Sequence, residues 1–224
     1  MIQKLLTSAL FFREFCNRFE TTGSIVPSGR FLARAITRYV ARRGAAPIRV
    51  LECGPGTGAF TNHIVGRLQR HDVFDIVELN GCFAEVLRSR FATDRRWQAA
   101  AESTSIYQLS LQDFAPQAPY DFIVSGLPHI NFPAKTVEEI IACYTRLLKP
   151  GGTLSYFEYM YIRPLRTAAT LGTQRHRVRA VDSLMSSHLR QHFVCRDRIF
   201  LNLPPAWVNH LTRGACTLQS SSTA

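Results

Sequence analysis

Three glycines alternate with other residues directly after a short apolar run in the stretch VLECGPGTGAF, residues 50–60. The apolar run carries one acidic residue, Glu52, and a helical pattern follows the glycines. Glycine adopts backbone conformations, and allows close approaches, that other residues resist. A strand, a glycine-rich turn and a helix in this order are typical of α/β proteins that hold a nucleotide-containing cofactor. The stretch therefore predicts an α/β fold with a cofactor bound at the turn.

Strand-like apolar runs alternate with helical patterns along most of the chain. This alternation predicts a mostly parallel sheet with helices on both faces. In such sheets ligands bind at the carboxyl ends of the strands, which is where the glycine turn falls. The expected strands are 48–53, 74–79, 105–109, 120–128, 153–162, 193–200 and 206–212, and the expected helices are 1–20, 29–43, 58–70, 82–91, 134–148 and 165–191.

The 224 residues carry a net charge of +11, almost all of it from arginine. Such an excess favours anionic partners: nucleic acid, acidic phospholipid or phosphorylated substrates. The six cysteines form no CxxC pair and show no metal-like spacing, which is typical of reduced thiols in the cytosol. No run reaches the roughly 18 to 20 apolar residues that cross a bilayer. We therefore expect a cytoplasmic protein without a structural metal.

The glycine turn is compatible with two kinds of cofactor. Gly54, Gly56 and Ala59 fit the dinucleotide pattern G-x-G-x-x-G/A, and Glu78 follows at about the expected distance of 20 residues. In that interpretation the backbone and the helix N-terminus hold a pyrophosphate. A glycine turn with a purely structural use is a third possibility, although packing alone gives little reason for three alternating glycines.

The competing pattern [D/E]-x-G-x-G-x-G is also satisfied, by Glu52, Gly54, Gly56 and Gly58. It resembles the first motif of class I S-adenosylmethionine-dependent methyltransferases. Their cofactor has no phosphate but has a cationic amino group and a sulfonium, so an acid at the end of the strand is chemically useful. With either cofactor, Glu78 at the end of the next strand can accept hydrogen bonds from both ribose hydroxyls.

Later segments favour the methyltransferase interpretation. DFIVSGLPHINF (121–132) stands where these enzymes carry their substrate-side motif, and LLKPGGTL (147–154) resembles their connection into the fifth strand. FVCRDRIFLNLPPAWVNHLTR (193–213) is similar to their closing β-hairpin, which NAD-binding folds lack. The resemblance implies a Rossmann-like, mostly parallel seven-stranded sheet with a C-terminal antiparallel hairpin. It also implies S-adenosyl-L-methionine as cofactor and S-adenosyl-L-homocysteine as product.

Four stretches resemble the bacterial phospholipid N-methyltransferases, which methylate phosphatidylethanolamine, and their relatives that act on ornithine lipids. The resemblance implies an aminolipid substrate at a membrane. The alternatives are an rRNA adenine or small-molecule methyltransferase of the same fold, or a non-catalytic cofactor- or membrane-binding protein. Gly126 and His129 replace the asparagine and the aromatic residue with which the rRNA enzymes grip adenine, so nucleic acid is not expected as a partner. The four stretches are 23–36, 50–61, 125–132 and 201–208.

Two segments outside the motifs are candidates for membrane contact. Residues 1–20 show an amphipathic helical pattern with phenylalanines and basic flanks, which can lie in a membrane interface or pack on the domain. The arginine-rich tract 163–198 can bind anionic lipid, form a solvated face or contact RNA. We expect an N-terminal helix and cofactor-covering segment (1–28), a methyltransferase domain (29–217) and a disordered tail (218–224). The expected protein is a monomer, peripheral on the inner face of the cytoplasmic membrane.

The substrate amine must lose a proton before it attacks the methyl group, because an ammonium ion has no lone pair. His129 after the fourth strand, and Glu158 and Tyr159 in the fifth, are the candidate catalytic residues. Aromatic residues around Glu158 can bind methylated ammonium by cation–π contacts or merely pack in the sheet. The predicted cofactor-binding residues are Glu52, Gly54, Gly56, Gly58, Glu78, Asp113, Ser125 and, by resemblance, Ser28.

Overall fold

The computed structural model describes residues 29–160, 184–185, 193–202 and 204–214. The strands are β1 (Arg49–Cys53), β2 (Val73–Val77), β3 (Thr104–Tyr107), β4 (Tyr120–Ser125), β5 (Leu148–Tyr159), β6 (Phe193–Ile199) and β7 (Ala206–Thr212). The α-helices are α2 (Arg30–Ile36), α3 (Arg38–Ala41), α4 (Thr61–Ile64), α5 (Gly81–Thr93), α6 (Arg95–Gln98) and α7 (Ala134–Leu147). Short 3₁₀ turns are η1 (Val65–Arg67), η2 (Ala101–Ser103) and η3 (His129–Asn131).

The seven strands form one sheet in the order β3-β2-β1-β4-β5-β7-β6. The first five strands of this order are parallel, and β7 is antiparallel to both β5 and β6. Strand order reverses beside β1, where the chain leaves β3 and returns as β4 on the other side of β1. The predicted Rossmann-like sheet with a closing antiparallel hairpin is confirmed, and the glycine loop lies at its switch point.

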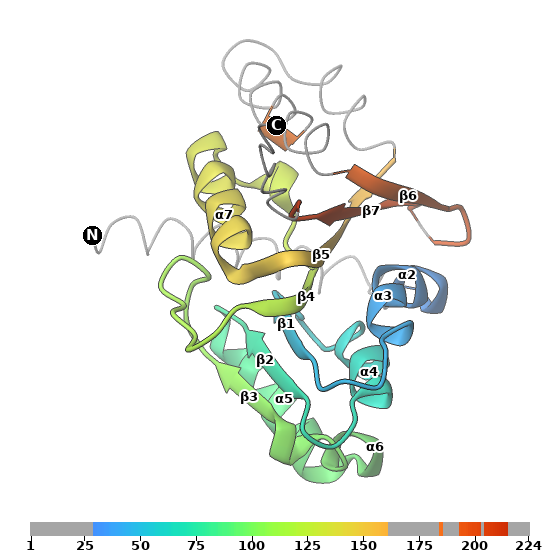
Figure 1. Ribbon diagram of the computed structural model, residues 1–224, viewed down its shortest axis with the longest axis vertical. Coiled ribbons are helices and arrows are strands. Elements are labelled where there is room, and N and C mark those ends of the chain that lie inside the picture. Colours follow the sequence, from blue (N-terminus) through green and yellow to red (C-terminus); the bar gives the residue numbers. More distant parts are fainter. Residues whose placement is uncertain (1–28, 161–183, 186–192, 203, 215–224) are drawn as a thin grey trace, which may run out of the picture.

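Helices cover both faces of the sheet (Figure 1). Side chains alternate between the faces of a strand, so each strand contributes to two cores. Leu51 and Ile123 belong to the core under α7, whereas Val50 and Val124 belong to the core under α2, α4, α5 and α6. Burial on both faces is what makes the central strands nearly continuous apolar runs.

Two helices differ from the sequence expectation. The helix expected at 58–70 begins only at Thr61, because Gly56 and Gly58 have positive φ angles that no regular helix adopts. The helix expected at 29–43 breaks at Thr37, whose hydroxyl donates a hydrogen bond to the carbonyl of Ala33. The helices expected at 1–20 and 165–191 lie outside the described residues, apart from positions 184 and 185.

Candidate functional site

The glycine loop and the loop after β4 touch backbone to backbone at the carboxyl edge of the sheet. The Gly126 amide donates a hydrogen bond to the carbonyl of Cys53, and the Gly54 amide donates one to Val77. A Cβ atom on Gly126 would lie 2.4 Å from the carbonyl oxygen of Gly54, so a larger residue cannot fit without moving the backbone. Gly54 itself has a φ of +65°. These glycines are required by the meeting of two loops, a reason for Gly126 that the sequence did not reveal.

Glu52 lies at the end of β1 with its side chain fully buried. One carboxylate oxygen accepts a hydrogen bond from the Thr61 hydroxyl at 2.7 Å, whereas the other has no hydrogen-bond partner among the described residues. Burial raises the pKa of Glu52 to about 8, with the Thr61 hydrogen bonds opposing the rise and the nearby Glu78 charge adding to it. A buried carboxylate oxygen with no partner is costly unless a ligand supplies a donor or a positive charge.

Glu78 lies one residue beyond β2 and is also buried. Its two oxygens accept hydrogen bonds from the backbone amides of Gly56, at 3.1 Å, and Asn80, at 2.8 Å. Burial raises the pKa of Glu78, and these backbone hydrogen bonds oppose that rise. The carboxylate therefore fixes the glycine loop, and each oxygen keeps a second lone pair that can accept from a ligand hydroxyl.

Leu79 was not identified from the sequence. It follows Glu78 directly, in the loop between β2 and α5 at the carboxyl edge of the sheet. Leu79 is 37% exposed. An exposed apolar side chain beside a carboxylate that can hold a sugar is suited to a flat ring attached to that sugar. No pattern marked it, because a single leucine after a strand is equally typical of a core position.

Ser125, Tyr144 and His129 form a buried hydrogen-bonded row at the end of β4. The hydroxyls of Ser125 and Tyr144 are 2.6 Å apart, and Nε2 of His129 lies 3.0 Å from the Tyr144 hydroxyl. The Leu127 amide donates to the Ser125 hydroxyl at 3.2 Å. Burial raises the pKa of Tyr144 well above its usual value, so its phenol stays neutral. The row attaches the loop after β4 to α7, and Tyr144 is a member that sequence reasoning missed.

The other two predicted catalytic residues lie on opposite faces of β5. Tyr156 belongs to the core under α7 and its ring contacts that of His129 edge-on, with 5.4 Å between the centroids. Glu158, two residues later, shares this face with Tyr156 because side chains alternate along a strand. Tyr159 packs instead with Phe157 against the core under α2. The structure thus places Glu158 and His129 on the same face, and Tyr159 on the other.

The remaining predicted cofactor residues are less informative. Asp113 is exposed in the loop after β3, where its carboxylate accepts a hydrogen bond from the Ser110 hydroxyl at 2.7 Å. Asp113 therefore lies beyond the end of β3, but its hydrogen bond with Ser110 uses part of its capacity to accept one from a ligand. Ser28 lies outside the described residues.

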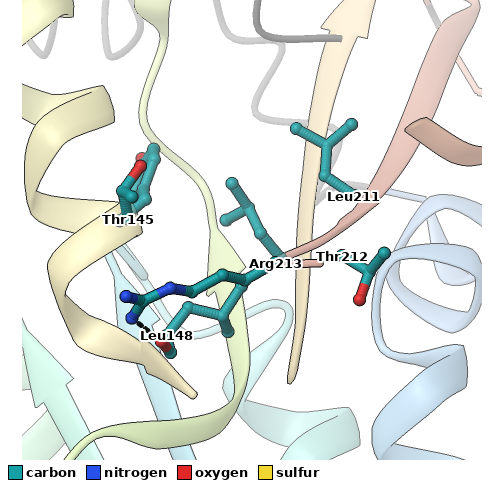
Figure 2. Close-up of a pocket in the computed structure, with 7 residues that line it drawn as sticks. Thr145, Leu148, Leu211, Thr212 and Arg213 are labelled. Atoms are coloured by element: carbon teal, nitrogen blue, oxygen red, sulfur yellow. Dashed lines mark hydrogen bonds between the residues drawn. The ribbon is translucent and has the colours of Figure 1, made fainter. Parts of the chain in front are cut away.

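The pocket in Figure 2 lies at the opposite edge of the sheet from the glycine loop, between the C-terminal end of α7 and the strands β5 and β7. The Arg213 guanidinium donates a hydrogen bond to the Leu148 carbonyl at 2.8 Å, drawn there as a dashed line. Thr145, Leu211 and Thr212 complete the labelled lining. The pocket is small and mostly apolar, and it lies at the opposite end of the strands from Glu52 and Glu78, so we assign it no part in the site.

Comparison with known proteins identifies the class to which this fold and site belong. The model of the methyltransferase domain family matches residues 26–193, so the chain is a member of that family. A curated relative, the ornithine lipid N-methyltransferase of Singulisphaera acidiphila, is 30% identical over 152 residues, which is 67% of this chain and 77% of the relative. The predicted family is confirmed, and the chain is an enzyme of the methyltransferase class.

Solved structures with the same fold include several methyltransferases in complex with the cofactor or its product. The N-methyltransferase NodS of Bradyrhizobium japonicum, in complex with S-adenosyl-L-homocysteine, has a TM-score of 0.59 at 16% identity, over 85% of this chain and 89% of that one. An O-methyltransferase of Bacillus cereus, also in complex with this product, has a TM-score of 0.60 at 14% identity, over 90% of each chain. Family membership and these neighbours support S-adenosyl-L-methionine as the cofactor.

Proposed function

We propose that the protein transfers methyl groups from S-adenosyl-L-methionine to the primary amine of a membrane aminolipid, either phosphatidylethanolamine or an ornithine lipid. It would act from the inner face of the cytoplasmic membrane as a peripheral protein. The relative named an ornithine lipid N-methyltransferase supports the lipid substrate. No helix in the described ranges is long and apolar enough to cross a bilayer.

The observation that carries the cofactor assignment is the buried Glu52 oxygen without a hydrogen-bond partner among the described residues. The amino group of the cofactor's methionine part is a cation with three N–H donors, which would satisfy that oxygen and favour the ionised carboxylate. A pyrophosphate would instead place negative charge beside two buried acids. Glu52 therefore fits the sulfonium cofactor and does not fit a dinucleotide.

The other residues of the loop fit the rest of the same molecule. Glu78 would accept hydrogen bonds from the ribose hydroxyls, and Leu79 would pack against the adenine attached to that ribose. Gly56, where a Cβ would meet no protein atom within 4 Å, would let the backbone approach the cofactor closely, and Gly54 and Gly58 would shape the same loop by allowing Leu127 and the Trp97 ring to pack against it. Ser28, Asp113 and Ser125 remain proposed neighbours of the cofactor, with Ser125 acting through the loop that it fixes. When bound, the cofactor supplies an electrophilic methyl group on a positively charged sulfur.

On the substrate side the protein must position a neutral amine in line with that methyl group and remove its proton. We propose Glu158 as the proton acceptor. It lies on the same face of β5 as Tyr156, whose ring contacts His129 in the loop after β4. His129 would position the loop after β4, since its Nε2 is occupied by the Tyr144 hydroxyl. Tyr159, on the other face, would serve by packing.

The test is methyl transfer from labelled S-adenosyl-L-methionine in detergent micelles, which removes any need for membrane binding. Phosphatidylethanolamine, ornithine lipid and total RNA are offered separately, with phosphatidylcholine as the matched control because its quaternary ammonium cannot accept a methyl group. We expect label in at least one aminolipid and none in phosphatidylcholine. Label in RNA alone would contradict the aminolipid proposal and support the RNA alternative.

The proposed role of Glu158 has its own test. Glu158→Gln should lower kcat in the aminolipid reaction while leaving cofactor affinity unchanged.

A further inference from the structure

The turn between β6 and β7 presents two large apolar side chains to solvent. Phe200 is 62% exposed and Leu201 is 72% exposed, the highest values among the large apolar residues that the structure describes. Two neighbouring apolar side chains at a hairpin tip contribute nothing to the cores of the domain. An exposed apolar feature of this kind is typical of a contact with a membrane or a partner.

Hydrogen bonds of the described turn residues attach the turn to the rest of the domain. Asn202 is buried, and its side chain accepts a hydrogen bond from the Gly29 amide at 2.8 Å and donates one to the Pro204 carbonyl at 2.7 Å. The Met160 amide donates to the Pro205 carbonyl at 2.9 Å. The tip is thus attached both to the start of α2 and to the end of β5.

The tip lies at the edge of the sheet where the candidate site lies. Ala206 pairs with Tyr159 at the carboxyl end of β5 and with Ile199 at the end of β6. The turn that joins β6 and β7 therefore projects beyond the carboxyl ends of the parallel strands, the edge that also carries the glycine loop and His129. Figure 1 shows the turn beside α2.

Arginines and aromatic rings lie on the three elements next to the apolar tip, β6, β7 and α2. Arg196 and Arg198 are exposed on β6, and each guanidinium lies over the ring of Trp207, at 5.3 and 5.1 Å from its centroid. On α2, next to the Gly29–Asn202 contact, the Arg30 guanidinium lies 4.9 Å from the centroid of the exposed Phe31 ring. Apolar side chains beside arginine and tryptophan match the chemistry of a bilayer interface with anionic headgroups.

From these observations we infer that the β6–β7 tip inserts into an anionic bilayer, with Phe200 and Leu201 entering the acyl region and Arg196 and Arg198 contacting lipid phosphates. This inference rests on the proposed aminolipid substrate and adds the surface that delivers it. Insertion at this edge would hold the mouth of the site against the headgroups, so that the substrate amine reaches the methyl donor without leaving the membrane.

The test is vesicle binding by the full chain, measured by flotation with vesicles of phosphatidylglycerol and phosphatidylcholine and without methyl donor. The double variant Phe200→Ser/Leu201→Ser should bind on the order of 10- to 100-fold more weakly, because two large apolar side chains no longer enter the bilayer. Val86→Ser is the matched control, since Val86 is an exposed apolar residue on α5, and its binding should equal that of the wild type. Equal binding by the double variant and the wild type would overturn the inference.

The charged part of the surface has its own comparison. Arg196→Ala/Arg198→Ala should weaken binding to anionic vesicles several-fold, whereas Arg88→Ala/Arg95→Ala, which removes the same charge from α5 and α6, should not. If the two pairs of variants lose binding equally, net charge and not this surface drives attachment.

Activity in micelles separates the membrane inference from the proposed function: the Phe200→Ser/Leu201→Ser variant should methylate aminolipid there at the wild-type rate. A wild type that is inactive on every aminolipid in micelles contradicts the proposed function, whatever the vesicle result.

The tip could instead contact a second copy of the chain. Sedimentation velocity decides this point, because a dimer that Phe200→Ser/Leu201→Ser converts to monomer, with unchanged vesicle binding, would contradict the membrane inference.

Discussion

The glycine-loop region and the closing hairpin each contain an acidic side chain that is shielded from solvent, fully at Glu52 and about three-quarters at Asp197, but the two acids have different partners. At the loop, Glu52 leaves one buried oxygen without a partner among the described residues. At the hairpin, both oxygens of Asp197 accept hydrogen bonds from Arg38, at 2.7 and 2.8 Å. An acid whose oxygens are both satisfied by protein groups contributes to the fold, whereas a buried acid oxygen without a protein partner indicates a place for a ligand donor. The contrast separates a binding site from a structural network.

The hairpin network extends further into the sheet. His210 lies between Ser155, 2.7 Å from its Nδ1, and Asp197, 3.3 Å from its Nε2. Burial and the Arg38 charge lower the pKa of His210 to about 4, with Asp197 opposing the shift, so the imidazole is neutral near pH 7. The row has the residue types of a hydrolase triad, but Ser155 and His210 are buried and no substrate can reach them. This row of side chains, together with Arg38, joins α3 to the strands β5, β6 and β7.

The largest expected effect comes from disrupting the backbone contact between the glycine loop and the loop after β4. Gly126→Ala places a methyl group against the Gly54 carbonyl, so we expect cofactor affinity to fall by at least about 100-fold as the loops separate. Gly44→Ala is the matched control, because a Cβ there meets nothing within 4 Å. Calorimetric titration with S-adenosyl-L-homocysteine measures both. Full affinity in the Gly126 variant would show that the loops do not depend on each other.

The converse effect is expected at the hairpin. Asp197→Ala leaves the Arg38 guanidinium, which is only about one quarter exposed, without its carboxylate, and should lower the free energy of unfolding by about 1–2 kcal/mol. Urea denaturation measures this loss, and Glu85→Ala, which removes an exposed ion pair with Arg88, should cost less than about 0.5 kcal/mol. Affinity for S-adenosyl-L-homocysteine should stay unchanged, and a large loss of affinity would contradict the division into site and scaffold.

The two regions should also respond to pH in opposite directions. The folded chain keeps the Glu52 proton up to a pKa of about 8, above the ordinary value of 4.5, so cofactor-free stability should fall as pH rises from 4.5 to 8. His210 has a folded pKa of about 4, below the ordinary 6.5, so its contribution should be lost as pH falls from 6.5 to 4. Burial also raises the pKa of Glu78, which adds to the decline as pH rises. Thermal unfolding across this range checks both directions, and Glu52→Gln should reduce the decline toward pH 8 while leaving the loss below pH 6.5 unchanged.

The smallest effect is expected at Leu79. Leu79→Ser removes the apolar surface proposed to meet adenine and should weaken S-adenosyl-L-homocysteine binding roughly 3- to 10-fold. Leu201→Ser, at the hairpin tip, is a control with a leucine of higher exposure, and its affinity should match the wild type. Equal affinities for the wild type and Leu79→Ser would show that the adenine ring does not pack against Leu79.

The sequence predicted the parts of the fold that depend on local pattern. Alternating apolar runs and helices predicted the sheet, and the glycines with Glu52 and Glu78 indicated the edge at which we expect the cofactor to bind. Pattern could not reveal contacts between distant segments, such as Gly126 against Gly54 or Tyr144 between Ser125 and His129. Nor could it separate Glu158 from Tyr159, since neighbours in a strand have opposite surroundings that depend on the other elements.

The most direct test of the central claim is calorimetric titration of S-adenosyl-L-homocysteine and NAD into the wild type and Glu52→Gln. The glutamine still accepts the Thr61 hydrogen bond but carries no negative charge for the ligand's amino group. We predict binding of S-adenosyl-L-homocysteine with release of a proton near pH 7, affinity at least about 10-fold weaker in the variant, and no binding of NAD. Unchanged affinity in Glu52→Gln, or NAD binding at the glycine loop, would contradict the account.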